Sequence, residues 1–186
     1  MAKVVQFQPL SIPAPFGPLR VRKKKADALE KNGQLNLFKG GKVISLLQQT
    51  TFDEAMLLEE TGDVSRAKER YLLSIQKQES VADAYCNLGI LEYQQKNNAK
   101  AVGYFTLSLK EDPRHFESHY NLANLYSELG NLSLAKVHYQ IAIEVEPTFT
   151  NSYFNLALTF ALNKETTEAV SMLQRYCQLA PEDEQN

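Results

Sequence analysis

Cysteine is scarce in this chain of 186 residues, and long apolar runs are missing altogether. The two cysteines, Cys86 and Cys177, stand too far apart to suggest a disulfide framework, so we expect free thiols in a reducing compartment. No apolar run reaches the roughly 18 residues of a membrane-spanning helix, so no membrane partner is expected. The N-terminal residues hold prolines where a secretory signal has an apolar core, which favours a cytoplasmic location.

Motifs that carry enzyme chemistry are missing as well. The chain has neither a Gly-rich phosphate loop nor a nucleophile elbow, and Cys86 has no recognisable partner base. His115 and His119 have the spacing of a metal pair, but His115 follows Pro113 closely and no second pair of ligands stands nearby. We expect His115 in a solvated loop and His119 packed on a helix. The sequence therefore predicts no enzyme, no metal and no cofactor.

What the chain does have is a period of 34 residues. Asn87, Asn121 and Asn155 share one phase of it, and Asp53 lies one step earlier. Small and large apolar residues follow the same period: Ala67, Ala101, Ala135 and Ala169 in one phase, and Tyr71, Phe105, Tyr139 and Leu173 in another. Such a period is typical of an array of helix pairs, in which small residues allow close approach and large ones fill the space between pairs.

Turn residues divide each unit in two. Pro113, Pro147 and Pro181 end three of the units, since proline cannot continue a helix. Gly62 and Gly130 fall at the end of the first helix of their units, where a helix C-cap favours glycine. Lys96 and Lys164 hold that position in the other two units. Each unit therefore reads as helix, turn, helix and exit.

On these residues, the chain resembles the tetratricopeptide repeat family. The resemblance implies an all-α, right-handed solenoid of antiparallel helix pairs over residues 48–181, in four units: 48–81, 82–115, 116–149 and 150–181. Unit one departs most from the pattern, with Glu54 where the others have leucine and Glu79 where they have proline. A first unit lacks a neighbour on one side, so we expect these residues to face solvent.

Charge separates the N-terminal arm from the repeats. Residues 1–47 hold nine Lys and Arg against two acidic residues, whereas residues 48–186 hold eleven against twenty. Residues 1–22 are expected to be a Pro-rich, basic, disordered arm. Residues 23–47 are expected to hold a short helix and a β-hairpin of two short strands, and residues 182–186 an acidic tail. The basic cluster comprises Arg20, Arg22, Lys23, Lys24 and Lys25.

In this family the first helix of each unit lines the concave groove, which implies its residues here. The expected peptide-binding groove comprises Phe52, Asp53, Asn87, Tyr120, Asn121, Asn124, Phe154 and Asn155. Aromatic side chains supply contact area, and a primary amide both donates to and accepts from a peptide backbone. The row of Asn87, Asn121 and Asn155 resembles the asparagine ladder of the O-linked N-acetylglucosamine transferase, from which Asp53 departs. The alternative is that these amides only bond neighbouring helices.

A carboxylate clamp, the other peptide-binding arrangement of the family, is disfavoured because its cations are absent. The corresponding positions hold Phe52, Met56, Asn87, Glu117 and Asn121.

Two functions remain open. The favoured one is an adaptor that binds one or more proteins through the groove, with self-association or a second partner at the C-terminal end around Val170, Leu173 and Tyr176. The alternative is a regulatory subunit whose basic arm contacts DNA or RNA; the acidic repeats are unsuited to nucleic acid, so only the arm would bind it. The arm either lies across the repeats and competes with ligands or faces outward, and the outward version is favoured.

Overall fold

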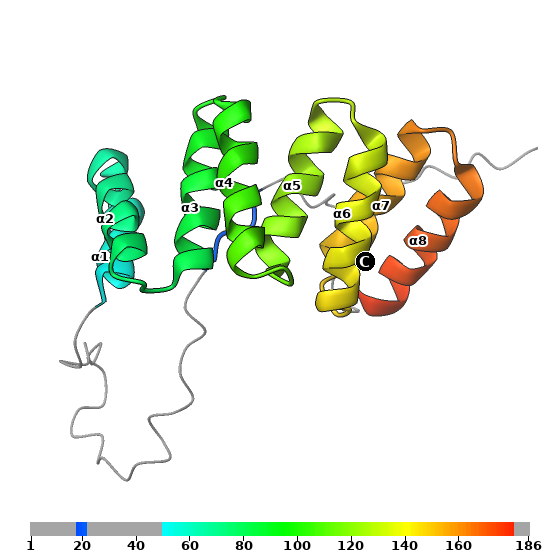
Figure 1. The fold of residues 1–186 in the computed structure, drawn as a ribbon. Coiled ribbons are helices and arrows are strands. Elements are labelled where there is room, and N and C mark those ends of the chain that lie inside the picture. Colours follow the sequence, from blue (N-terminus) through cyan, green and yellow to red (C-terminus); the bar gives the residue numbers. More distant parts are fainter. Residues whose placement is uncertain (1–17, 22–49, 181–186) are drawn as a thin grey trace, which may run out of the picture.

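The computed structural model describes residues 18–21 and 50–180, and all regular structure in these ranges is helical. Eight helices follow one another as antiparallel pairs in a single row (Figure 1). They are α1 (Thr51–Glu60), α2 (Val64–Gln76), α3 (Val81–Gln94), α4 (Asn98–Glu111), α5 (Phe116–Glu128), α6 (Leu132–Val145), α7 (Thr150–Leu162) and α8 (Thr166–Leu179). The predicted solenoid of helix pairs is confirmed.

The helices begin where polar residues can cap their free N–H groups. Thr50 and Asp53 form a reciprocal capping box at α1, in which each side chain accepts from the other's backbone N–H at 3.1 Å. Asp63 and Asn131 cap α2 and α6 by accepting from the N–H three residues on. These caps fix the start of α1, α2 and α6 and therefore the phase of the face that each of them buries.

The turn inside every unit has the same backbone conformation. Gly62 and Gly130 have φ values of 84° and 77°, and Lys96 and Lys164 take up 63° and 62° at the equivalent positions. This left-handed conformation is easy for glycine and costly for lysine. The reversal of the chain is thus enforced in units two and four by the packing of the helices that flank it.

The core lies between the two helices of each pair and between successive pairs. Ala67, Ala101 and Ala135 are fully buried, and so are the large residues of the other phase, Tyr71 and Phe105. Burying one such aromatic side chain contributes roughly 2–3 kcal/mol. The two phases of the period thus supply the close contacts and the bulk that hold the row together, as the sequence predicts.

The two acidic residues at which unit one departs from the family pattern have local partners, although the Glu54 side chain is 43% exposed. The Glu79 carboxylate accepts a hydrogen bond from the Thr51 backbone N–H at 2.7 Å and so caps the start of α1. Glu54 lies 3.4 Å from Arg70 in an ion pair on the neighbouring helix. Both departures from the family pattern therefore have local partners, which the sequence period alone does not reveal.

Several expectations fall outside the described residues: the helix and hairpin within 23–47, the acidic tail and most of the basic cluster. Within the described ranges, no helix combines the length and apolar character that crossing a bilayer requires.

Candidate functional site

A short piece of the N-terminal arm lies against the first helices of the repeats. Residues 18–21 form an extended segment, drawn in blue in Figure 1, beside α3 and α5. The Asn121 amide bonds both polar backbone groups of Leu19: Oδ1 accepts from the N–H at 2.7 Å, and Nδ2 donates to the carbonyl at 2.8 Å. One repeat unit earlier, on α3, Asn87 Oδ1 accepts from the Val21 N–H at 3.3 Å. Two rungs of the asparagine row thus contact main chain at alternate residues of one strand-like segment.

Between these two rungs, Arg20 reaches α1. Its guanidinium lies 2.9 Å from the Glu59 carboxylate, whose side chain is only 6% exposed. Tyr71 donates a hydrogen bond to the other oxygen of the same carboxylate at 2.7 Å. Burial, followed by the contact with Glu59, raises the pKa of the Tyr71 hydroxyl, so Tyr71 remains a donor. A buried carboxylate in this position requires a cation, because an unpaired charge is costly away from water.

The aliphatic side chains of the segment meet apolar surface. Leu19 packs against the core cluster that contains Tyr120, and it lines a cavity of about 670 Å³ together with Phe116 and Phe149. The rings of Phe116 and Phe149 meet edge to face, with centroids 5.0 Å apart. Tyr120, a predicted groove residue, therefore belongs to an aromatic wall whose other members the sequence reasoning missed.

Val21, two residues further along the segment, is buried as well. It belongs to the same core cluster as Phe52 and lines the same cavity. The Phe52 ring in turn packs on that of Tyr71 at 5.5 Å. In the segment, the aliphatic side chains of Leu19 and Val21 pack on the repeats. The arginine between them, Arg20, reaches the carboxylate of Glu59.

Asn87, Asn121 and Asn155 differ in the groups to which they hydrogen-bond. Asn87 Nδ2 points inward to the Tyr71 hydroxyl at 3.1 Å. Asn155 Nδ2 donates to the Tyr120 hydroxyl at 3.0 Å and to Asn124 Oδ1 at 3.2 Å. Asn121 contacts the arm through both the oxygen and the nitrogen of its amide, and Asn87 contacts it through the oxygen alone. The two bonds of Asn155 described above connect residues within the repeats. Bonds to an extended main chain and bonds between helices therefore both occur in this row.

The remaining predicted groove residues have other neighbours. Asp53 belongs to the capping box of α1, and Asn124 accepts from the Tyr139 hydroxyl at 2.6 Å in the core. The Phe154 ring packs on Tyr176 of α8, with centroids 5.3 Å apart. Of the predicted groove residues, Phe52, Asn87, Tyr120 and Asn121 lie together around the segment. The contacts described above for Asp53, Asn124, Phe154 and Asn155 are with other parts of the repeats.

Acidic residues surround the segment. Glu117 lines a hollow with Leu19 and Arg20, and Asp83 lines the larger cavity. His115 is not the solvated loop residue expected from the sequence: it is buried, caps α5 by accepting from the Ser118 N–H at 3.2 Å, and lies 2.9 Å from Asp83. The chain turns after Pro113, so that His115 becomes the N-cap residue of α5 and its side chain lies against the first turn of that helix. Arg20 likewise differs from the favoured outward-facing arm, since it faces α1.

The repeats match known families at three places. A tetratricopeptide repeat family covers residues 52–116, a second covers 116–149 and a third covers 151–183. The chain belongs to the tetratricopeptide repeat family. Proteins of this family serve as interaction scaffolds for other proteins and are typically not catalysts. A comparison with curated proteins gave no match.

Solved structures of MamA share the fold of this tetratricopeptide array. A crystal structure of MamA has a TM-score of 0.63 at 18% identity, over 69% of this chain and 75% of that one. MamA from residue 41 to its end, from Desulfovibrio magneticus RS-1, has a TM-score of 0.60 at 16% identity, over 69% and 73% of the two chains. At these identities the likeness concerns the arrangement of helices alone.

Cys86 lies beneath the segment. Its side chain is fully buried, and burial raises the pKa of the thiol to about 12. Asn121 Nδ2 lies 3.7 Å from the sulfur. A protonated thiol in such a place is a small packing group, and its chemistry is unsuited to a nucleophile.

A second histidine contact appears on the outer side of α5. His119 Nε2 donates to the Pro113 carbonyl at 3.0 Å, and His119 Nδ1 lies 2.9 Å from Nδ1 of His138. His119 Nδ1 is then the acceptor and His138 the donor. In the described part of the tetratricopeptide array, no group of three or more His, Cys, Asp or Glu side chains is placed to hold a metal.

The histidine pair predicts a pH dependence of stability. Burial lowers the pKa of His119, and burial together with the charge of His119 lowers the pKa of His138 to about 4; His115 disfavours and Asp112 favours the charged form of His119. Because an unfolded histidine titrates near 6.5, the unfolded chain binds the proton first, so stability is present above pH 6.5 and is lost as pH falls towards 4.

Replacing His138 with glutamine should remove part of that loss. After allowance for partial exposure, we expect the parent to lose about 1 kcal/mol more than His138→Gln between pH 7 and pH 5. Urea unfolding of both proteins at the two pH values measures the difference. Equal losses would show that the pair does not titrate with folding.

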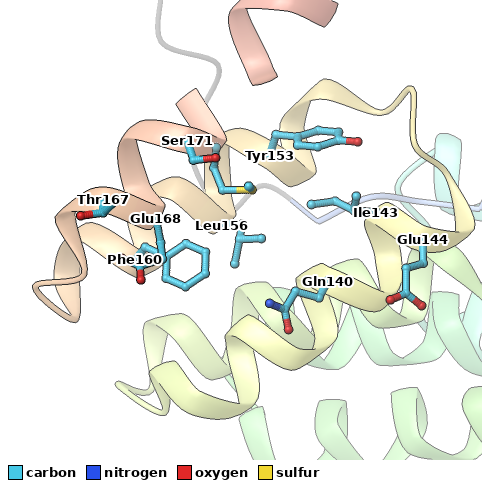
Figure 2. Close-up of a pocket in the computed structure, with 10 residues that line it drawn as sticks. Gln140, Ile143, Glu144, Tyr153, Leu156, Phe160, Thr167, Glu168 and Ser171 are labelled. Carbon is cyan, nitrogen blue, oxygen red and sulfur yellow. The ribbon is translucent and has the colours of Figure 1, made fainter. Parts of the chain in front are cut away.

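Another cavity, of about 710 Å³, lies at the C-terminal end between α6, α7 and α8 (Figure 2). Gln140 and Ile143 of α6 face Ser171 and Thr167 of α8 across Leu156 of α7. The wall is mixed and holds one carboxylate from each outer helix, Glu144 and Glu168. Nearby on α8, Val170 and Leu173 are 54% and 39% exposed, so the uncovered end expected from the sequence exists; association through it stays a prediction.

Proposed function

We propose that this tetratricopeptide protein is a non-enzymatic adaptor whose concave groove binds an extended segment of a partner protein. The observation that carries this proposal is the two-bond contact between the Asn121 amide and the main chain of Leu19. A side chain that satisfies both backbone groups of one residue reads extended conformation and leaves the identity of that residue to its neighbours.

The surroundings of that amide support the same role. Aromatic walls at Phe52 and at Phe116, Tyr120 and Phe149 supply apolar contact for alternate side chains. Glu59, Asp83 and Glu117 make the groove acidic, which favours a basic ligand. Nucleic acid would be repelled by these carboxylates, and contact of Arg22 and Lys23 with it stays a prediction because they lie outside the described residues.

A displayed library of random peptides, selected on the full chain, tests this function. Enriched peptides should be added to protein labelled with ¹⁵N, and the side-chain amide resonances of asparagine recorded. We expect the resonances of Asn87 and Asn121 to shift strongly and that of Asn124, which is buried in the core, to shift little. Peptides that instead perturb the cavity of Figure 2, or a library from which nothing is enriched, would contradict groove binding.

A further inference from the structure

We propose that Leu19, Arg20 and Val21 are the groove's built-in competitor, and that a partner displaces them with a segment of the same class: an arginine between two aliphatic residues. This inference rests on the proposed function and adds the ligand chemistry and the regulation of the site. The chain holds its own ligand-like segment in place through contacts that recognise main chain, charge and apolar side chains at once.

The register of the segment defines the ligand. Leu19 sits at α5 and Val21 at α3, so the segment runs from later repeats towards earlier ones. Its alternate residues meet successive rungs of the asparagine row. A partner segment bound in the same way has its N-terminal side towards α7 and one aliphatic residue for each rung.

Glu59 supplies the charge selection. Its carboxylate is nearly buried, accepts from Tyr71, and has Arg20 as its cation at 2.9 Å. A ligand that places a neutral or acidic residue there leaves a negative charge without a cation in a place with little water, which is strongly unfavourable. Arginine is better suited than lysine, because its planar fork reaches a carboxylate with directed N–H groups and is more weakly hydrated.

Covalent attachment makes the resident segment a competitor. Residues 22–49 join it to α1 in the same chain, and an attached segment acts at an effective concentration on the order of millimolar. If the resident segment by itself binds with a dissociation constant of tens of micromolar, every free ligand of the groove is weakened roughly ten-fold or more. Partners must therefore bind tightly or contact additional surface before the groove opens.

A peptide with the sequence FGPLRVRKKK, copied from residues 16–25 and labelled with a fluorophore, tests the proposal by anisotropy. It is titrated into the full parent chain and into the full chain carrying Arg20→Glu and Val21→Asp. Both substitutions lie on the arm, so the repeats keep their own residues, and circular dichroism checks that the helices remain. We expect the peptide to bind the arm variant at least ten-fold more tightly than the parent.

A second peptide tests the proposed selection of arginine by Glu59. The peptide FGPLEVRKKK should bind the arm variant at least ten-fold more weakly than the arginine peptide, and adding Glu59→Gln should remove most of that discrimination. Equal affinity of the arginine peptide for parent and arm variant would overturn competition while leaving groove binding intact. If the arginine peptide binds neither protein, the proposed ligand class is wrong. The proposed function is then tested by the library peptides alone.

A second measurement separates this chain's own groove from that of another copy. Light scattering should find the parent and the arm variant in the same association state over the concentrations of the titration, because association through the C-terminal end would affect both equally. A parent that dimerises while the arm variant does not would overturn the proposal, because the segment would then occupy the groove of a second molecule.

Discussion

Replacing Gly89 with alanine is expected to lower the free energy of unfolding by about 1–2 kcal/mol, although alanine is the better helix former. A Cβ at Gly89 of α3 would meet the Phe105 ring of α4 at 2.6 and 2.7 Å, well inside van der Waals contact. The ring is fully buried and has no empty space to enter. The strain of overpacking, typically 1–3 kcal/mol or more, then exceeds the gain of about 1 kcal/mol in helix propensity. Denaturant unfolding measures the net effect.

The same helix pair offers a matched control. Gly103 lies on the exposed side of α4, and a Cβ there meets nothing within 4 Å. Gly103→Ala should therefore raise stability by about 0.5–1 kcal/mol. Adding Phe105→Leu to Gly89→Ala should recover part of the loss, since the aromatic ring atoms that the new Cβ meets are then removed. A Gly89→Ala protein as stable as the parent would refute the close approach.

The period of 34 residues was enough to predict the fold, because its alanine, aromatic and turn phases each have one structural role. Ala101 and Phe105 have the burial that their phases predict, and all four turn positions have the same left-handed backbone. The departures in unit one, Glu54 and Glu79, were assigned to solvent. Their partners, Arg70 and Thr51, lie elsewhere in the same unit, and a pattern of residue types along the chain does not reveal which side chains pair across a helix pair.

The site was less predictable, and for a different reason. The repeat phase gave Asn87, Asn121 and Asn155 the same standing. In the structure Asn87 and Asn121 contact the arm, whereas Asn155 donates to Tyr120 and Asn124. Phe116 and Phe149 stand at the starts of α5 and α7, outside the rows that the family pattern places in the groove. A signal was available, since both are large apolar residues in stretches where a helix cap would favour polar ones.

Replacing Asn121 with alanine is expected to weaken binding of the FGPLRVRKKK peptide by roughly 30-fold in the chain whose arm carries Arg20→Glu and Val21→Asp. The substitution removes two hydrogen bonds to the ligand main chain, each worth about 1 kcal/mol. Asn155→Ala is the matched control from the same row. It removes bonds to Tyr120 and Asn124, so we expect a stability loss of about 2 kcal/mol and a change in peptide affinity below about three-fold.

In the parent chain the effect of Asn121→Ala on peptide affinity should shrink to less than about five-fold, because the substitution weakens the resident segment and the free peptide through the same amide. The apparent affinity of the peptide depends on the ratio of its own affinity for the groove to that of the resident segment. Because the substitution lowers both affinities, most of the loss cancels. Anisotropy titrations of the four proteins, with and without each change, form the cycle that measures this. A loss of similar size in both backgrounds would mean that Asn121 binds the peptide and that no arm competes. No loss in either background would mean that the amide does not contact the ligand, since a group that touches neither competitor leaves both affinities unchanged.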